Sequence, residues 1–225
     1  MQLFFLEDVP TEWEDRHSEM LPVLSVERRE RIAHYRFSSD KLLSLYSAVL
    51  VRYAIDMAGV LPDSCRPTFS GGINEKPFCN EAAFLDFSIS HTHDAVLCGT
   101  TSIGKIGVDL EPLREAPFEI MKIVFHDNEI VEISSHNSES DLRFFKMWTR
   151  KEAYTKCIGT GLVANLTQID TTESVTNERT ITWQEGKYIC SVYADKDRFS
   201  QISRVSCEEL EDYCRSKIII TNFLN

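Results

Sequence analysis

A chain of 225 residues, 43% of them hydrophobic and 13 of them Phe, can bury the core of one large domain or of two closely packed halves. The formal net charge of -11 argues against a nucleic-acid-binding protein, which would carry a basic stripe, and against docking on anionic lipid. The 7 cysteines are scattered without a CxxC pair, which indicates neither a disulfide framework nor a zinc site but buried thiols in a reducing, cytoplasmic compartment.

The N-terminal segment MQLFFLEDVP has no basic region followed by a long apolar run, so residues 2–6 predict a first strand and not a signal peptide. No apolar run in the chain approaches the length of a membrane span. The next segment, ERRERIAH at 27–34, is charged and helical in composition, and Arg28 and Arg31 share a face. These arginines are either ligand contacts or part of a solvated helix face.

A core helix is predicted for KLLSLYSAVLVRYAIDMAG, with Asp40 as its N-cap, Gly59 at its end and apolar residues at helical spacing. Residues 62–80 then form a loop rich in turn formers. Within it, Gly71-Gly72 permits unusual backbone angles, and Pro77 stiffens the chain beside Lys76. Such a loop either brings backbone N–H groups and one cation to a phosphate or is only a connection.

The segments FLDFSIS and AVLCGTT predict two strands of a hairpin around the polar stretch SHTHD at 90–94. Ser90 and His91 are adjacent on a strand and therefore point to opposite faces, which excludes a Ser–His catalytic relay between them. The functional interpretation is a hydroxyl, a backbone amide and an imidazole in contact with a phosphate. The alternative is an ordinary polar turn.

The segment KIGVDLEPL predicts a strand on which Ile106, Val108 and Leu110 face one way. Asp109 and Glu111 face the other way, beside Gly107, which leaves room. Two carboxylates this close repel unless a cation or a shared proton lies between them. Mg²⁺ suits such a pair, because it takes oxygen ligands and usually completes its shell with substrate phosphates. The alternative is an edge strand with a solvated acidic face.

One amphipathic helix is predicted over residues 117–132. A second helix is predicted over 141–159, and it carries the residues most indicative of function. On the second helix, Trp148, Glu152 and Lys156 are four residues apart and form one row. Ser138 with Asp141 is a capping-box pattern, and Gly159 suits the C-cap. An ordinary salt bridge between Glu152 and Lys156 is the alternative to a functional row.

The C-terminal part predicts a loop from Thr160, a hairpin around Glu185-Gly186, a strand at 201–206, a short charged helix at 207–217 and a last strand at 218–224. It contains no motif that we can assign to chemistry.

The motifs GVDLE at 107–111 and WTRKEAYTK at 148–156 together resemble the signature of the Sfp-type 4'-phosphopantetheinyl transferases. That family has a G-[VI]-D-x-E strand and, some forty residues later, a W-[ST]-x-K-E-[AS]-x-x-K helix. The resemblance covers residues 25 to 165, including the Lys76-Pro77 loop, the turn ISHT at 89–92, the charged stretch at 27–36 and VLVR at 49–52.

The resemblance implies that the 4'-phosphopantetheine arm of coenzyme A is transferred, with Mg²⁺, to a serine hydroxyl of an acyl or peptidyl carrier protein, releasing 3',5'-ADP. By this resemblance the metal ligands are Asp109, Glu111 and Glu152. Glu152, or a water that it holds, is the base, and Lys156 is the cation on the pyrophosphate. Phosphoryl transfer requires chiefly positioning and charge neutralisation, which these residues supply.

The resemblance also implies two groups of coenzyme A contacts. Those at the 3'-phosphate and adenosine are Arg28, Arg31, Ser44 and His91. The others are Lys76, Pro77, Ser90, Thr92, Glu152 and Lys156. The family often has lysines in place of Arg28 and Arg31, which keeps the charge but changes the geometry. Lys151 resembles the lysine of the helix motif and is expected to have no direct chemistry, because it lies off the Glu152 row.

The implied fold is α+β, with two pseudo-symmetric halves, 1–105 and 106–225, and the ligand cleft between them. We expect a monomeric cytoplasmic enzyme of nonribosomal peptide or polyketide biosynthesis that binds neither nucleic acid nor membrane. Two other functions are compatible with the residues. One is another Mg²⁺-dependent phosphoryl- or nucleotidyl-transfer enzyme, and the other is a non-catalytic acidic interaction module.

Overall fold

The computed structural model describes residues 1–71, 75–135, 139–160, 165–197 and 201–224. Its strands are β1 (Gln2–Leu6), β2 (Phe69–Ser70), β3 (Phe78–Cys79), β4 (Asp86–Thr92), β5 (Ala95–Thr101), β6 (Ile106–Pro112), β7 (Thr180–Glu185), β8 (Tyr188–Ala194) and β9 (Ile202–Val205). Its α-helices are α1 (Asp15–Met20), α2 (Val26–His34), α3 (Ser38–Met57), α4 (Met121–Val124), α5 (Asp127–Ser134), α6 (Ser140–Ile158), α7 (Ser174–Arg179) and α8 (Cys207–Leu224).

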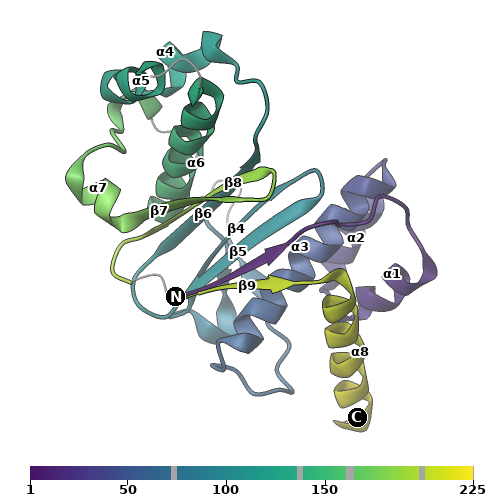
Figure 1. Cartoon of the computed structure of the whole chain (residues 1–225). Coiled ribbons are helices and arrows are strands. Elements are labelled where there is room, and N and C mark those ends of the chain that lie inside the picture. Colours follow the sequence, from purple (N-terminus) through teal and green to yellow (C-terminus); the bar gives the residue numbers. More distant parts are fainter. Residues whose placement is uncertain (72–74, 136–138, 161–164, 198–200, 225) are drawn as a thin grey trace.

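Two sheets form the centre of the molecule, and a long helix covers the outer face of each (Figure 1). The first sheet has the order β4-β5-β1-β9, and the second has the order β6-β8-β7. Helix α3 packs on the first sheet in one core cluster, and α6 packs on the second sheet. A further core cluster joins the facing sides of β1, β5, β6 and β8. The predicted α+β class is confirmed.

The alternation of side chains on β6 explains how this strand serves both a core and a site. Ile106, Val108 and Leu110 are buried in the cluster between the two sheets, as the period of two predicts. The opposite side of the strand faces α6. The predicted strand at residues 2–6 is confirmed as β1, and the predicted hairpins are confirmed as β4–β5 and β7–β8.

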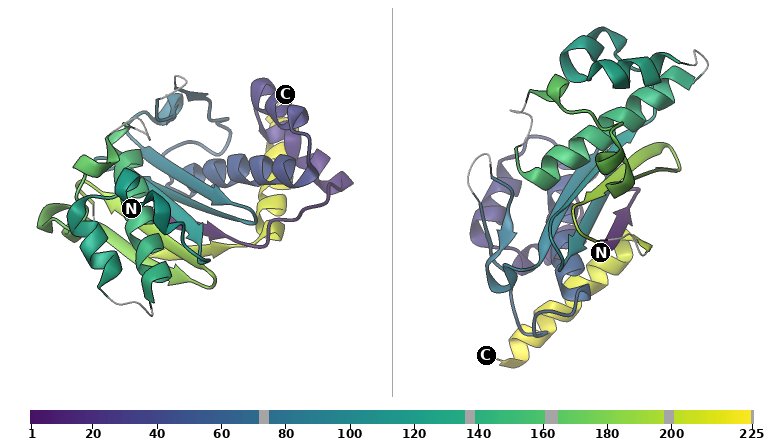
Figure 2. Two further views of the ribbon diagram at one scale, coloured as in Figure 1. Left: turned by 90° about the horizontal axis from the view of Figure 1, so that it is seen from above. Right: turned by 90° about the vertical axis from the view of Figure 1, so that its left-hand side faces the viewer.

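The last strand and helix return to the first sheet. Strand β9 pairs in parallel with β1, and α8 packs against α1 and α3. Two tyrosines of α3 fasten it: the hydroxyl of Tyr46 donates to Glu211 over 2.8 Å, and that of Tyr53 donates to Glu209 over 2.5 Å. Helix α8 lies at the opposite end of the molecule from α6 (Figures 1 and 2).

The prediction of a last strand at residues 218–224 was wrong, because α8 continues through this segment. The β-branched run favours a strand locally, but a strand needs a free sheet edge, whereas a helix satisfies its own backbone groups. Helix α8 is also anchored before this segment, since Lys217 forms an ion pair with Asp56 over 2.6 Å. No helix in the described part of the chain is long and apolar enough to cross a membrane.

The single helix predicted over 117–132 is divided into a 3-10 turn (Phe118–Ile120), α4 and α5. The chain is extended at Phe125, and the imidazole of His126 caps α5 by accepting from the N–H of Asn128. Phe125 and Glu129, which both lie in the predicted helix, therefore belong to different elements. Glu129 is in fact fully buried and pairs with Lys151 over 2.5 Å.

Two predicted helix caps differ from the structure. Phe37 is the N-cap of α3, and Asp40 lies in the first turn, where its charge suits the helix dipole. Ser138 lies outside the described residues, and Glu139 holds the N-cap position of α6. The carboxylate of Asp141 accepts instead from the N–H of Ala116 over 2.9 Å. Gly159 ends α6 in the left-handed conformation, as predicted.

The loop predicted over residues 62–80 contains the short antiparallel pair β2–β3. Gly72 lies outside the described residues. In the β4–β5 hairpin, Ser90, His91 and Thr92 belong to β4, so the turn is shorter than the polar stretch suggested.

Candidate active site

Helix α6 packs directly on β6 because Gly107 has no side chain. A Cβ at this position would lie 1.9 Å from the carbonyl oxygen of Ala153 and 2.6 Å from the backbone nitrogen of Cys157. No real side chain tolerates such distances, so the contact requires glycine. The close approach brings the row of α6 that carries Lys156 over the polar side of β6.

Asp109, Lys156 and Ser90 meet where β6, α6 and β4 come together. The Lys156 ammonium donates to Asp109 Oδ1 over 2.7 Å and to Ser90 Oγ over 2.8 Å. The Ser90 hydroxyl donates to the same Asp109 oxygen over 2.7 Å. Burial raises the pKa of Asp109, although Lys156 and Ser90 oppose that shift. Lys156 therefore pairs across to β6, which does not support the ordinary salt bridge to Glu152.

The other two predicted carboxylates lie beside this cluster. The indole N–H of Trp148 donates to Glu111 Oε1 over 3.3 Å, so Trp148 and Lys156 both face β6 from α6, as the helical row predicts. Glu152 lies between them in the row and is 9% exposed. Burial, and then repulsion from Asp109, raise the pKa of Glu152 to about 7. Burial and Asp109 also raise the pKa of Glu111.

These carboxylates have the chemistry that a hard divalent cation requires. Asp109 Oδ2 and Glu152 Oε1 are buried and have no hydrogen-bond partner in the described structure. Their proximity is costly for negative charge, and a cation would relieve it. Within the described ranges, however, no three acidic, histidine or cysteine side chains are arranged as a complete metal site. The residues fit a Mg²⁺ ion that takes further oxygen ligands from a bound phosphate.

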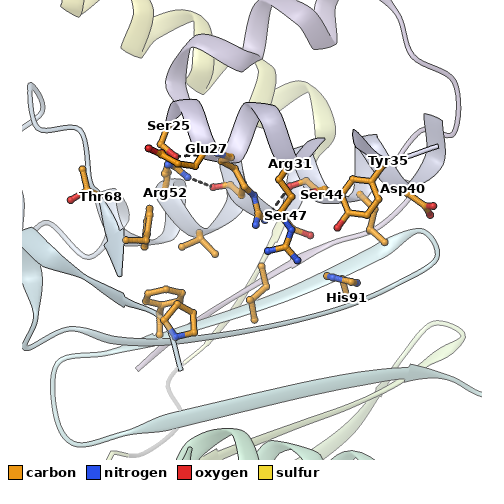
Figure 3. A pocket seen from close by; sticks show the side chains of 18 residues that line it. Ser25, Glu27, Arg31, Tyr35, Asp40, Ser44, Ser47, Arg52, Thr68 and His91 are labelled. Atoms are coloured by element: carbon orange, nitrogen blue, oxygen red, sulfur yellow. Dashed lines mark hydrogen bonds between the residues drawn. The ribbon is translucent and has the colours of Figure 1, made fainter. Parts of the chain in front are cut away.

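A pocket of about 800 Å³ opens between α2, α3 and the neighbouring strands (Figure 3). Five of the predicted coenzyme A contacts line it: Arg28, Arg31, Ser44, Pro77 and His91. Further residues that sequence reasoning did not assign also line it, among them Tyr35, Ser47, Arg52, Phe69 and Phe87.

The cations of this pocket lie close enough to affect one another. Burial, and then repulsion from Arg31, lower the pKa of Arg28. Burial, and then repulsion from Lys156, lower the pKa of His91, and Arg28 and Arg31 add to the effect. His91 thus lies between the arginines of the pocket and the Lys156 cluster. Cations of the pocket and of the Lys156 cluster therefore both act on His91, and an anionic ligand that reaches both groups of cations would be favoured.

The other five predicted contacts lie outside the pocket lining, namely Glu152 and Lys156, described above, and Lys76, Ser90 and Thr92. Lys76 forms an ion pair with Asp86 and donates to the carbonyl of Ile106 over 2.6 Å, which fastens the 62–80 loop to β6. Ser90 belongs to the Lys156 cluster. Thr92 is half-buried at the end of β4.

Lys151 makes structural contacts in the interior of the protein. It is fully buried, pairs with Glu129, and donates to the carbonyls of Leu166 and Ile169 over 2.7 and 2.8 Å. Glu129 in turn accepts from the Thr171 backbone and hydroxyl. The lysine of the helix motif therefore joins α6 to α5 and to the segment before α7.

The comparisons with known proteins agree with the two motifs. Residues 105–214 match the family model described as the 4'-phosphopantetheinyl transferase superfamily. The chain is 26% identical over 175 residues to 4'-phosphopantetheinyl transferase psf-1 of Bacillus pumilus, covering 77% of this chain and 74% of that protein. It is 30% identical over 141 residues to 4'-phosphopantetheinyl transferase gsp of Aneurinibacillus migulanus, covering 62% and 57%.

A third relative is 4'-phosphopantetheinyl transferase Sfp of Bacillus subtilis (strain 168), with 27% identity over 150 residues and 66% of each chain covered. The matches to gsp and Sfp thus span less than two thirds of those relatives' length. The resemblance predicted from the residues at 107–111 and 148–156 is confirmed. Residues 105–214 therefore match the 4'-phosphopantetheinyl transferase superfamily, and the chain is similar to 4'-phosphopantetheinyl transferases of the Sfp type.

Proposed function

We propose that this protein transfers the 4'-phosphopantetheine arm of coenzyme A to a serine hydroxyl of an apo acyl or peptidyl carrier protein and releases 3',5'-ADP. The observation that carries the proposal is that Ser90 and His91 lie on opposite faces of the edge strand β4, one toward the Lys156 cluster and the other toward the pocket. His91 lines the cationic pocket, and Ser90 contacts both Lys156 and Asp109. A ligand with one anionic group in the pocket and another at Lys156 would span the two.

Coenzyme A has this distribution of charge. In the proposed arrangement, Arg28, Arg31, Ser44 and His91 contact its 3'-phosphate and adenosine, and Pro77 forms part of the wall. Lys156 and the Ser90–Thr92 end of β4 receive the pyrophosphate, and Lys76 holds the loop in place. Contacts of this kind to phosphate are charge-assisted and among the stronger hydrogen bonds in proteins.

The transfer step follows from the buried carboxylates. The serine oxygen of the carrier forms a bond to the phosphorus that bears the pantetheine arm, and the bond from that phosphorus to the bridging oxygen of 3',5'-ADP breaks. Glu152, or a water that it holds, takes the serine proton. Mg²⁺ held by Asp109, Glu111 and Glu152 would neutralise charge that develops on the phosphates.

We also propose that 1–105 and 106–225 are the two halves that meet at the ligand, since the boundary falls between β5 and β6, with β9 and α8 of the second half returning to pack on the first. A monomer in the cytoplasm that serves nonribosomal peptide or polyketide carriers is part of the same proposal. The 7 cysteines are free thiols, five of them buried and Cys65 and Cys207 half-buried, which supports a reducing compartment.

A comparison of donors with one apo carrier protein tests this proposal. Coenzyme A and an acyl-coenzyme A are expected to be used with similar kcat/KM, because no contact in the proposed arrangement involves the thiol. Dephospho-coenzyme A is expected to be markedly poorer, since it leaves Arg28, Arg31 and His91 without their anion. Transfer from ATP in place of coenzyme A would instead indicate a nucleotidyl- or phosphoryl-transfer enzyme. Failure of Mg²⁺ with coenzyme A to raise the melting temperature would favour a non-catalytic module.

A further inference from the structure

Strand β4 has two faces with different contacts, because alternate side chains of a strand point to opposite sides. On one face, three residues line the pocket: Phe87, Ile89 and His91 (Figure 3). On the other face, three residues bond to β6: Asp86, Ser88 and Ser90. The strand that lines the pocket is therefore also the strand against which the carboxylate-bearing strand β6 packs.

Side chains of β4 hold β6 by its backbone. Asp86 Oδ2 accepts from the N–H of Ile106 over 2.7 Å. Two residues further along both strands, Ser88 Oγ accepts from the N–H of Val108 over 3.1 Å. Ser88 is 5% exposed, and both N–H donors belong to fully buried residues, so each donor needs a partner inside the protein. The second of these bonds lies at the residue that directly precedes Asp109.

No backbone ladder joins β4 to β6 among the described strands. Strand β4 pairs with β5, and β6 pairs with β8, so each is an edge strand of its own sheet. In a continuous sheet, backbone hydrogen bonds would fix the register of neighbouring strands. Between β4 and β6, the hydrogen bonds that fix it run to side chains instead.

Asp86 also connects β6 to the loop that carries Pro77. Its carboxylate forms an ion pair with Lys76, and the Lys76 ammonium donates to the carbonyl of Ile106 over 2.6 Å. Asp86 and Lys76 thus satisfy both the N–H and the carbonyl of Ile106. Pro77, the next residue, lines the pocket. One carboxylate is therefore shared by β4, by β6 and by a loop of the pocket lining.

We propose that Asp86 and Ser88 are positioning residues, which hold β6 at a fixed register against β4. The inference rests on the proposed function, in which Asp109 on β6 binds Mg²⁺ and His91 on β4 contacts coenzyme A. Asp86 and Ser88 act through the backbone of β6, in the way that outer partners commonly orient metal ligands. A ligand that spans both strands depends on this register, because a small displacement of one contact weakens binding and slows reaction.

The test compares the affinity for coenzyme A in EDTA with the affinity in Mg²⁺, both measured by calorimetry. Binding in EDTA reports on the pocket, whereas the gain on adding Mg²⁺ reports on the position of Asp109 relative to the bound phosphates. We expect Ser88→Ala to weaken binding about 10-fold or more in Mg²⁺ and hardly at all in EDTA. Ser206→Ala is the matched control and should change neither affinity. It removes a hydroxyl that accepts from a backbone N–H over the same 3.1 Å, at the start of α8.

Asp86 is tested by rescue. Asp86→Ala removes the acceptor of the Ile106 N–H, whereas Asp86→Asn keeps an oxygen there and loses only the charge. We expect Asp86→Ala to weaken binding in Mg²⁺ more than in EDTA, and Asp86→Asn to recover most of the Mg²⁺-dependent loss. The values of kcat with an apo carrier protein, corrected for the folded fraction, should follow the same order. These two variants also provide the test if Ser88→Ala does not fold.

Equal losses in EDTA and in Mg²⁺ for Ser88→Ala, or no loss in either, would overturn the positioning role, and so would equal binding by Asp86→Ala and Asp86→Asn. A purely structural role would lower the melting temperature and leave the ratio of the two affinities unchanged. Mg²⁺-dependent binding of coenzyme A by the wild type, without modification of any carrier protein, would refute the proposed function and leave the positioning role standing.

Discussion

Lys156 on α6 lies 2.7 Å from Asp109 on β6, and this ion pair connects the two sequence motifs in space. The two side chains differ in their exposure to solvent: that of Asp109 is 6% exposed and that of Lys156 is 29% exposed. The ammonium group can therefore reach a ligand without leaving the carboxylate. Asp109 Oδ2, on the other side of the carboxylate, remains without a partner in the described structure.

Replacing Asp109 with Asn should abolish transfer but preserve the fold. Burial already raises the pKa of this carboxyl, so a neutral side chain of the same shape is tolerated, whereas the charge is needed at the reacting phosphates. We expect kcat/KM for coenzyme A to fall at least about 100-fold, with thermal melts showing the folded state. Asp94→Asn is the control, because Asp94 also pairs with a lysine, Lys187, over 2.6 Å, but on a hairpin turn. Near wild-type turnover of Asp109→Asn at saturating Mg²⁺ would show that Asp109 is not part of the metal site.

Lys156→Met should weaken the binding of coenzyme A. Loss of a charge-assisted phosphate contact costs about 1.5–3 kcal/mol, which corresponds to about 10- to 150-fold in Kd. Lys187→Met removes an exposed lysine from a comparable acid pair and should have no effect on Kd. Both are measured by calorimetric titration with coenzyme A and Mg²⁺. A loss of only a few tenths of a kcal/mol for Lys156→Met would place Lys156 away from the phosphates.

Lys151→Met should lower the stability of the protein and leave transfer intact, which is the opposite of what we expect for Asp109→Asn and Lys156→Met. Lys151 is fully buried against Glu129, and removal of one partner of a buried pair costs about 3–5 kcal/mol of unfolding free energy. The folded fraction should nevertheless transfer at a normal rate, because Lys151 contacts backbone carbonyls and not the pocket. Urea unfolding and active-site-corrected kcat separate the two effects. Normal stability with lost activity would mean that Lys151 contacts substrate.

Glu152 should make the metal-free protein less stable as the pH rises. Its pKa is about 7 in the folded protein and near 4.5 in the unfolded chain, so the folded state holds a proton that the unfolded state releases between these values. Stability therefore falls from about pH 4.5 to 7 by an amount on the order of 1–3 kcal/mol. Glu152→Gln should remove this component and exceed the wild type in unfolding free energy at pH 8 in EDTA.

Urea unfolding at pH 5 and pH 8 checks this result, with Glu30→Gln as a control at an exposed carboxylate of α2. If wild type and Glu152→Gln lose the same free energy between the two pH values, the carboxylate is not destabilised in the folded state.

The active-site core was predictable because it depends on local periodicity. The alternation in β6 places Asp109 and Glu111 together on the side away from the core, and the four-residue spacing in α6 places Trp148 and Lys156 on one row. Gly107 was recognised as leaving room, although the structure shows that the room is occupied by the backbone of α6.

The deep part of the pocket was not predictable in this way. Helix α3 is apolar around most of its surface, so Ser47 and Arg52 have the pattern of a core helix and not of a ligand face. Their exposure to the pocket depends on where α2 and the β2–β3 pair fold against α3. The helix break at Phe125 was missed for a related reason, since the side-chain cap of His126 overrides the apolar spacing.

The most direct measurement of the proposed activity is the intact mass of purified apo carrier proteins after incubation with this protein, coenzyme A and Mg²⁺. We expect at least one carrier to gain the mass of a single 4'-phosphopantetheinyl group on its serine. We also expect no gain with EDTA or with the Asp109→Asn variant. Unchanged mass in acyl and peptidyl carriers that a known 4'-phosphopantetheinyl transferase converts in parallel would contradict the account.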